Sequence, residues 1–456
     1  MTDAQQSTVK RSWLDIAVPA LLVAGTAATR MPRLSDPRAF VFDEIYYAPD
    51  AAEMLRRGVE KGGVVHPPAG KWLIAIGIRL FGFTPFGWRF AALVCGCIIV
   101  LLTYIAARQF VSGRLVPAVA AGAVALDGVS FTTGRTAHLD VFLALFTTLA
   151  ITLTLVALRD PTNQKRVRWC MVGSGVALGL GLAVKWSAGF LLLGVLLAFL
   201  WMRGREAATP GHGKRIFATV LTLTVLPVGV YLAAYTPWIV NFDKTYIHIV
   251  RCRNNNECSE SLTERIRLFL RDQDRIRQFQ QSSLQEGNSN ADLSWKWINQ
   301  MHPSTLFRKT CTPQLNQAPN DLADQSCAGA KPGDIVEIVT VANPIVWFAG
   351  MGAGLILAWR AVFRRDRLAF FLLAFGLYQW LPWAINPRHS YTFYIAPLIP
   401  AIALWIAAVL AKKPFKWLLP AFAVLTVVAF AFYYPIWAGK PMSPDQIRAR
   451  EYWRAY

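Results

Sequence analysis

The sequence predicts an all-α protein that crosses a membrane many times. Hydrophobic residues make up 54% of the 456 residues, and charged residues only 16%. Soluble domains of ordinary composition carry about 25% charged residues. Long apolar runs alternate with short polar stretches along most of the chain, as is typical of transmembrane helices. These observations argue against a chain of two or three soluble domains.

About eleven apolar segments are candidates for the membrane helices. The first follows Lys10-Arg11 and runs to Thr29. It has features of a signal peptide, but we expect an uncleaved helix because the residues just beyond it carry the candidate chemistry. Several segments are shorter than the roughly 20 residues that span a bilayer at right angles, so 115–158 and 169–201 are also compatible with short helical hairpins. The other ten segments are 86–108, 115–132, 138–158, 169–184, 187–201, 216–236, 341–359, 368–384, 391–411 and 417–435.

Basic residues in the short loops predict the orientation. They occur on alternate connections, and the positive-inside rule assigns such connections to the cytoplasm. The N-terminus is then cytoplasmic, and the opposite face receives 30–85, the long loop 237–340, the turn 385–390 and the C-terminus. The basic positions are Lys10, Arg11, Arg108, Arg114, Lys165, Arg166, Arg168, Arg203, Arg205, Lys214, Arg215, Arg364, Arg365, Arg367, Lys412, Lys413 and Lys416.

This topology divides the chain into three units. Residues 1–236 form an N-terminal membrane module that includes the external loop 30–85. Residues 237–340 form the long external loop, and 341–456 form the C-terminal membrane helices with an external tail. Within the long loop, apolar residues at helical spacing alternate with arginines, which predicts an amphipathic helix in the headgroup layer or, alternatively, one packed on a small soluble subdomain. The apolar positions are Leu262, Ile266, Phe269, Leu270, Ile276 and Phe279.

The cysteines fall into two groups. Cys95, Cys97 and Cys170 lie in apolar segments, where cysteine behaves as a small hydrophobic residue. The other four lie in the long loop and predict disulfides in an oxidising compartment. A metal knuckle would need a second ligand pair that the spacing does not provide. The simplest pairs join neighbours in sequence, although the sequence leaves the connectivity open: Cys252 with Cys258, and Cys311 with Cys327.

The net charge of +20 would suggest nucleic acid in a soluble protein. Here the basic residues lie largely between apolar segments, so membrane orientation and lipid headgroups account for them better.

Asp43 and Glu44 follow the first apolar segment and are surrounded by Phe42, Tyr46 and Tyr47. Adjacent acids can form a solvated turn or the start of a helix. A partly desolvated carboxylate has a raised pKa and suits general-base chemistry. Because neighbouring helical residues point about 100° apart, both carboxylates cannot face one atom. We therefore expect one to act as the base and the other to bind or orient.

Two further features supply cations near these acids. The turn from His66 to Lys71 contains Pro67 and Pro68, which stiffen it. It is either a simple entry to a helix or a site where Lys71 and His66 meet a phosphate. Isolated charges at the outer ends of the membrane segments are functional candidates, although long side chains often extend to the interface without a function. These charges are Arg30, Arg89, Arg135, Asp140, Lys185 and Arg388.

With these residues, the N-terminal part of the chain, to about residue 160, resembles the protein O-mannosyltransferases of glycosyltransferase family 39 in the GT-C superfamily, particularly the actinobacterial members. A weaker match covers Leu381-Pro382-Trp383 and Arg388 to Pro397. The motifs that carry the resemblance are Phe42-Asp43-Glu44, His66-Pro67-Pro68-Ala69-Gly70-Lys71-Trp72, Phe81-Gly82 with Pro85, Trp88-Arg89, Leu126-Asp127-Gly128 and Gly134-Arg135-Thr136-Ala137-His138-Leu139-Asp140.

The resemblance implies an inverting glycosyltransferase of the bacterial plasma membrane that acts on its outer face. Mannose would move from polyprenyl-phosphate-mannose to Ser or Thr hydroxyls of exported proteins, with the secretion machinery as a possible partner. It implies that Asp43 is the base, that Glu44 is its essential neighbour, and that Arg30 and Arg89 matter for activity, with Arg89 or Arg388 near the lipid phosphate. It also implies the GT-C fold of about eleven spans. The long loop is too short for the extra MIR domain of eukaryotic members, so the loop and the membrane face would hold the acceptor.

The chemistry needs one base and cations for the leaving lipid phosphate, so we expect no tightly bound metal. Three alternatives stay open. A GT-C enzyme could glycosylate a lipid or a cell-wall glycan instead of a protein. A transporter or flippase would carry its charges near the bilayer midplane on broken helices, whereas these charges lie on one face. A structural assembly factor would give no reason for the acids beside the rigid basic turn.

Overall fold

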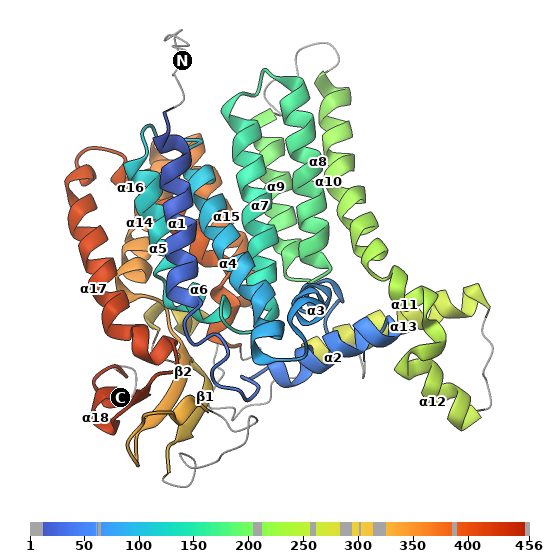
Figure 1. Ribbon diagram of the computed structural model, residues 1–456. Helices are drawn as coiled ribbons and strands as arrows, with labels where there is room; N and C mark the ends of the chain where they lie inside the picture. The colour runs from blue at the N-terminus through green and yellow to red at the C-terminus, as the bar shows by residue number, and fades with distance from the viewer. Residues whose placement is uncertain are drawn as a thin grey trace.

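The chain forms a layer of long helices with smaller elements gathered at one end (Figure 1). The computed structural model describes residues 12–60, 62, 65–203, 212–255, 261–282, 294–300, 302–312, 325–384 and 390–451. The start of α1 and the short helix α18 near the C-terminus lie at opposite ends of the helical layer. Lys10, Arg11, Arg205, Cys258 and Arg388 lie outside the described residues.

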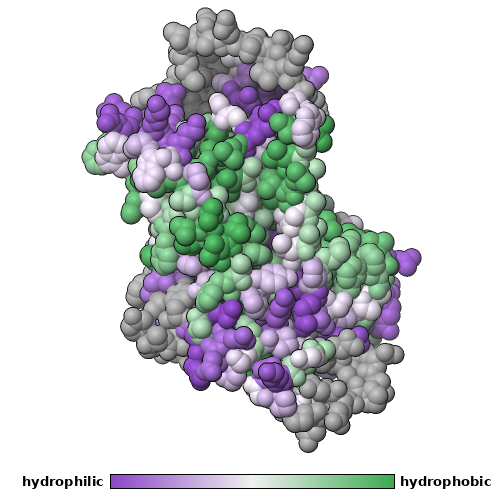
Figure 2. Space-filling model, turned by 60° about the vertical axis from the view of Figure 1, so that its left-hand side comes forward, coloured by the Kyte–Doolittle hydropathy of each residue, from purple (hydrophilic) through white to green (hydrophobic). Residues whose placement is uncertain are grey.

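A helix lies in each of the eleven apolar segments. Five are long and apolar enough to cross a membrane: Pro85–Ala107, Leu139–Arg159, Gly213–Ala234, Pro344–Phe363 and Phe415–Trp437. Figure 2 shows a hydrophobic belt between two more hydrophilic ends. The protein is therefore a multi-pass membrane protein, while the number of crossings stays a prediction. The eleven helices are α1 (Leu14–Arg30), α4 (Pro85–Ala107), α5 (Leu115–Ala125), α7 (Leu139–Arg159), α8 (Gln164–Leu182), α9 (Ala188–Arg203), α10 (His212–Ala234), α14 (Pro344–Phe363), α15 (Arg367–Ala384), α16 (Leu398–Leu410) and α17 (Leu419–Trp437).

The predicted segment 115–132 is interrupted at Asp127. This residue is extended and caps the short helix α6 (Gly128–Thr133) by accepting a hydrogen bond from the Ser130 N–H at 3.0 Å. Its other carboxylate oxygen accepts the Asn343 N–H at 2.9 Å. An N-cap aspartate satisfies free N–H groups at the start of a helix. Asp127 therefore ends one helix, begins the next and ties both to the start of α14.

The other helices lie at the end of the layer that carries the C-terminal elements (Figure 1). Helix α2 follows the loop after α1, and α3 follows the stiff proline turn. Short 3-10 turns connect several elements. The additional helices are α2 (Glu44–Arg57), α3 (Ala69–Phe81), α11 (Thr236–Val240), α12 (Tyr246–Asn255), α13 (Leu262–Ser282) and α18 (Pro444–Arg448), and the 3-10 turns are η2 (Phe242–Lys244), η3 (Ser294–Asn299), η5 (Gln325–Cys327), η6 (Thr392–Ile395) and η7 (Phe415–Leu418).

The prediction of an all-α fold is wrong in one place. An antiparallel sheet contains β1 (Ser304–Thr310), β2 (Ile335–Thr340) and β3 (Pro441–Met442) in the order β1-β2-β3. The β-branched sequence of β2 favours a strand, and its side chains are mostly buried. Because β3 belongs to the tail, the sheet joins two of the three predicted units, and the boundary at 340 separates paired strands.

Helix α13 occupies the predicted amphipathic segment. Leu268 and Phe269 are buried against Tyr235, Trp238 and Phe242, so one face packs on the protein. The apolar side chains of Leu262, Ile266, Leu270 and Phe279 are exposed. That exposed face is suited to the interfacial layer of a membrane.

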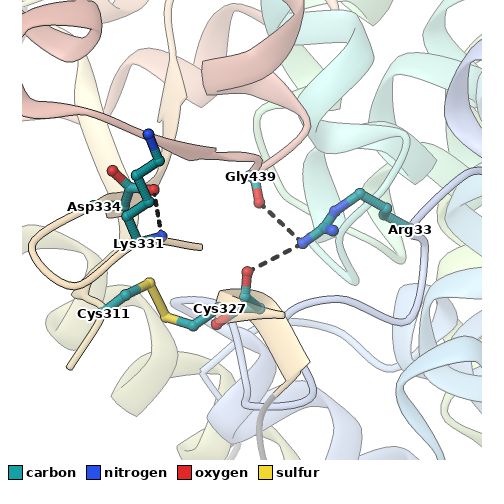
Figure 3. The surroundings of a disulfide bond; sticks show 7 residues. Arg33, Cys311, Cys327, Lys331, Asp334 and Gly439 are labelled. Carbon is teal, nitrogen blue, oxygen red and sulfur yellow. Dashed lines mark hydrogen bonds between the residues drawn. A yellow bond between two sulfur atoms is a disulfide. The ribbon is translucent and has the colours of Figure 1, made fainter. Parts of the chain in front are cut away.

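The structure contains the disulfide Cys311–Cys327 (Figure 3). Arg33 Nη2, in the loop between α1 and α2, donates to the Ser326 carbonyl at 3.3 Å and to the Gly439 carbonyl at 3.4 Å. This arginine therefore connects the first external loop, the disulfide segment and the C-terminal tail. Cys252 is also disulfide-bonded. Cys95 and Cys97 are free, buried thiols.

Candidate active site

Glu44 lies at the centre of a buried hydrogen-bond cage. Its carboxylate accepts five hydrogen bonds, from Val41 N–H (2.9 Å), Trp88 Nε1 (3.2 Å), Ala137 N–H (2.9 Å), Arg89 Nε (2.8 Å) and Arg89 Nη2 (2.7 Å). The side chains of Glu44 and Arg89 are 0% and 1% exposed. Burial alone would raise the pKa of Glu44, but Arg89 and the backbone donors lower it below its usual value. The carboxylate is therefore a fixed anion that joins α2, α4 and the turn before α7.

Arg89 uses all of its donors inside this cage. Besides the two bonds to Glu44, Nη1 donates to the carbonyls of Leu34 (3.0 Å) and Pro37 (2.9 Å), and Nη2 donates to that of Ala39 (3.0 Å). A guanidinium has five N–H groups, and these contacts account for all five. The sequence suggested that Arg89 meets the lipid phosphate, but the geometry leaves it no N–H for that role.

Arg135 and Arg30 also hold the chain rather than face an opening. Arg135 donates to the carbonyls of Arg30, of Pro32 at 2.7 Å and of Arg33 at 2.9 Å, all at the end of α1. Arg30 is fully buried and donates to Ser130 Oγ at 3.0 Å. The end of α1 carries free carbonyl groups that need donors. In the structure these arginines contact the backbone and a serine, and their contact with a lipid phosphate stays a prediction.

Asp43 follows a residue with an unusual backbone conformation. Phe42 has φ +49°, a left-handed conformation that is strained for an aromatic residue. Its ring lies 5.7 Å from that of Phe393 and 5.1 Å from that of Tyr391. Asp43 precedes α2 but makes no capping hydrogen bond. Asp43 as a residue is partly exposed, while Glu44, one residue later, points into the protein.

The environment of Asp43 suits a base that works near neutral pH. Burial raises the pKa of Asp43 to about 6, while the charge of Lys185 lowers it and that of Asp140 raises it. The Tyr47 hydroxyl donates to Asp43 Oδ2 at 3.2 Å. Burial and the charge of Asp43 raise the pKa of Tyr47 well above its usual value, so Tyr47 stays protonated and remains a donor.

Lys185 is the cation that the structure brings to Asp43. Its Nζ contacts both carboxylate oxygens of Asp140, at 2.9 and 2.8 Å, and lies 4.6 Å from the ring centroid of Tyr394. Asp140 belongs to the first turn of α7, and Lys185 follows α8. The sequence identified Lys185 only as one of several edge charges, and no local pattern pairs residues 45 positions apart.

The two candidate residues of the proline turn, Lys71 and His66, contact protein side chains in the structure. Lys71 is buried and forms ion pairs with Glu60 at 2.9 Å and Asp50 at 3.4 Å, and its contact with a phosphate stays a prediction. The His66 ring lies 6.2 Å from the ring of Tyr47. Of the two predicted contacts, His66 is thus the one beside Tyr47, whose hydroxyl bonds the candidate base. In the described part of the chain, no three His, Cys, Asp or Glu side chains are grouped so that they could hold a metal ion.

Comparisons with known proteins agree on one class. The family model described as dolichyl-phosphate-mannose-protein mannosyltransferase matches residues 84–242. A polyprenol-phosphate-mannose–protein mannosyltransferase of Mycolicibacterium smegmatis is 31% identical over 94% of this chain and 90% of its own length. One from Mycobacterium tuberculosis is 30% identical over 95% and 90%.

Solved structures show the same fold. One chain of the S. cerevisiae Pmt1–Pmt2 protein O-mannosyltransferase complex bound to the sugar donor has a TM-score of 0.76 at 14% identity, covering 97% of this chain and 93% of that one. ArnT from Cupriavidus metallidurans bound to undecaprenyl phosphate has a TM-score of 0.58 at 18% identity, covering 98% and 73%. At these identities the likeness concerns the fold alone.

Proposed function

Because this chain belongs to the family of polyprenol-phosphate-mannose–protein mannosyltransferases, we propose that it transfers mannose from a polyprenyl-phosphate carrier to Ser or Thr hydroxyls of exported proteins. The observation that carries this proposal is that two adjacent carboxylates lie in different environments. The oxygens of Glu44 accept five hydrogen bonds from the protein. Asp43 accepts one, from Tyr47, has a pKa raised to about 6 by burial and lies in the field of Lys185.

The reaction is a single displacement with inversion at the sugar carbon. The acceptor oxygen attacks the anomeric carbon of mannose, and Asp43 takes the hydroxyl proton. The bond between the anomeric carbon and the phosphate oxygen breaks, and the lipid phosphate leaves with the electron pair. Proton removal by a positioned base near its pKa accelerates such a step by about 10²–10⁴. A lipid phosphate is a good leaving group, so no strong acid is required.

Lys185 is the residue we assign to the leaving phosphate. Charge that develops on the phosphate oxygens is stabilised by a fixed cation in a site that excludes water. Asp140 and the ring of Tyr394 fix the Lys185 ammonium in place. His66, beside Tyr47, is a second candidate contact for the donor, and Arg388 stays a prediction from the sequence.

Glu44, Arg89, Arg30 and Arg135 act as positioning residues in this proposal. Their contacts hold the segment between α1 and α2 at its two ends. Asp43 lies at the end of that segment. Their importance for activity would then come from the placement of Asp43 and not from contact with substrate.

We place the reaction on the extracytoplasmic face of a bacterial plasma membrane. Support comes from the basic loops: Arg108, Arg114, Arg166 and Lys214 lie at helix ends opposite to Asp43, which the positive-inside rule assigns to the cytoplasm. The disulfide Cys311–Cys327 lies among the elements on the Asp43 side, which suits an oxidising compartment.

The test follows label from radiolabelled polyprenyl-phosphate-mannose in membranes that contain the wild-type chain, Asp43→Asn or the control Asp445→Asn, with a Thr-rich peptide as acceptor. Asp445 is an exposed carboxylate on α18. We expect label in the peptide for the wild type and the control but not for Asp43→Asn, and no loss of transfer in EDTA. Label in a lipid or glycan instead of the peptide would replace the protein acceptor by the alternative one. Equal transfer by Asp43→Asn would refute the role of Asp43.

A further inference from the structure

A cavity of about 430 Å³ lies between α8, α9 and α10. Its apolar wall includes Val167 and Met171 from α8, Phe199 from α9 and Ile216 from α10. Its polar residues include Arg168 and Arg215. Cavities of roughly 300–1,000 Å³ accommodate small molecules, so this one is large enough for part of a lipid.

The cavity lies far from the candidate active site. It is lined by residues from the first turns of α8, whereas Lys185 follows the other end of that helix. At 1.5 Å per residue, Arg168 and Lys185 are separated by about 25 Å along the helix. In Figure 1 the first turns of α8 and α10 lie at the opposite end of the layer from α2 and α13. The cavity therefore faces the other leaflet and is separate from the donor site.

The packing of α8 against α10 explains why the cavity exists. A Cβ at Gly179 would lie 2.7 Å from Val230 Cβ and 2.8 Å from the Pro227 carbonyl, so the two helices touch closely there. Near the start of both helices the facing residues are larger, and the cavity opens between them. The hydroxyl of Thr219 already donates to the Arg215 carbonyl at 3.0 Å, so this threonine does not require a ligand of its own.

Two of the cavity's lining residues are cations with no partner among the described residues. Within the described residues, neither Arg168 nor Arg215 forms an ion pair or a side-chain hydrogen bond. Both are exposed, and both lie in the first turns of α8 and α10, at helix ends that the charge pattern assigns to the cytoplasm. Guanidinium groups bind phosphate oxygens with paired hydrogen bonds. The combination of two such groups above an apolar wall matches an amphiphile with an anionic head.

We propose that this cavity binds an anionic phospholipid of the leaflet opposite to the active site. Arg168 and Arg215 would contact its phosphodiester, and the upper part of one acyl chain would pack on Val167, Met171 and Phe199. Basic pockets between membrane helices on the cytoplasmic side are suited to such headgroups. The lipid would fill the wedge between α8 and α10. It would thereby stabilise α10, which leads into α11 and α13 and is otherwise largely exposed along its apolar face.

The test uses the full chain in a neutral detergent and measures lipid retention by native mass spectrometry together with the unfolding temperature. Phosphatidylglycerol, phosphatidylcholine and inorganic phosphate are added separately. We expect phosphatidylglycerol alone to bind and to raise the unfolding temperature. Equal effects of phosphatidylcholine would refute selection by charge, and an equal effect of inorganic phosphate would refute a lipid ligand.

Three variants distinguish lipid binding in the cavity from a non-specific attraction between opposite charges. Arg168→Gln/Arg215→Gln should weaken phosphatidylglycerol binding on the order of tenfold or more. Lys165→Gln/Lys214→Gln removes the same charge from the same two helices outside the lining and should leave binding unchanged. Thr219→Trp fills the cavity, keeps both arginines and should also abolish binding. Equal weakening by both charge variants, or full binding by Thr219→Trp, would overturn the proposal.

Discussion

The exchange Glu44→Gln tests whether this carboxylate positions Asp43 or takes part in the reaction. Glutamine keeps the shape of the side chain but replaces one acceptor oxygen by an NH₂ group. Since both oxygens of Glu44 accept hydrogen bonds, from Arg89 and from other donors, the new NH₂ group must face a donor. Arg89 would also lose its carboxylate partner while it remains 1% exposed.

The magnitude follows from the burial of the pair. Removal of one partner from a buried ion pair costs about 3–5 kcal/mol because the other charge stays uncompensated. We expect Glu44→Gln to lower the free energy of unfolding by this amount and to lower kcat through displacement of Asp43. Asp43→Asn should behave in the opposite way. Burial disfavours the Asp43 anion in the folded protein, so this variant should abolish transfer without loss of stability at pH 7.5.

The assay combines denaturant unfolding in detergent micelles with transfer kinetics for Glu44→Gln, Asp43→Asn and the double variant Glu44→Leu/Arg89→Met. The double variant removes both buried charges but also the partners of three N–H groups and three carbonyls, so it should regain neither stability nor activity. If Glu44→Gln retained wild-type stability and lost activity as completely as Asp43→Asn, Glu44 would be a catalytic group and our reasoning would be wrong.

Three further outcomes are expected. Transfer should increase with pH through about 6 and level off above it, because Asp43 must be ionised to accept a proton and its pKa is raised to about 6; a rate profile from pH 5 to 8 that is flat across this range would contradict that assignment. Lys185→Gln should lower kcat by on the order of 10²–10³, with partial recovery in Lys185→Arg, as measured by single-turnover transfer; an unchanged kcat would remove Lys185 from the phosphate site. Cys311→Ser/Cys327→Ser removes a disulfide of sequence separation 16 and should lower the free energy of unfolding by about 3 kcal/mol in the same assay. The control repeats the comparison under reducing conditions, where the variant and the wild type should be equally stable; equal stability without reductant would contradict the prediction.

The membrane helices could be predicted from the sequence because their signal is local. Each long apolar run corresponds to a helix, and the main departure, the break at Asp127, arises from a cap that also bonds Asn343. The sheet could not be predicted in this way. Its strand β3 has only two residues, and its partner β2 lies about a hundred positions earlier. A two-residue strand carries no periodic pattern.

The candidate site shows the same division between local and distant information. Adjacent residues on a helix cannot face one atom, so the separation of Asp43 from Glu44 follows from the sequence. The partners do not, because Arg89 is 45 residues from Glu44 and Lys185 is 45 residues from Asp140. The sequence predicts that Arg89 and Lys71 face a phosphate. In the structure, buried charges are instead balanced within the protein at Arg89 and at Lys71, as their burial requires.

The place of β3 has a consequence for the biosynthesis of the protein. This strand pairs with β2 through Ile335↔Met442 and Val336↔Pro441, and Ile338 of β2 packs in one cluster with Val41, next to Phe42 and Phe393. Residues 441–442 follow α17 in the sequence, so they leave the ribosome after the helices from α1 to α17. In the proposed topology, β3 can therefore pair with β2 only once α17 has been inserted and the tail has crossed the membrane. A chain that is still being translated has all of its candidate catalytic residues but not yet the surface that supports them.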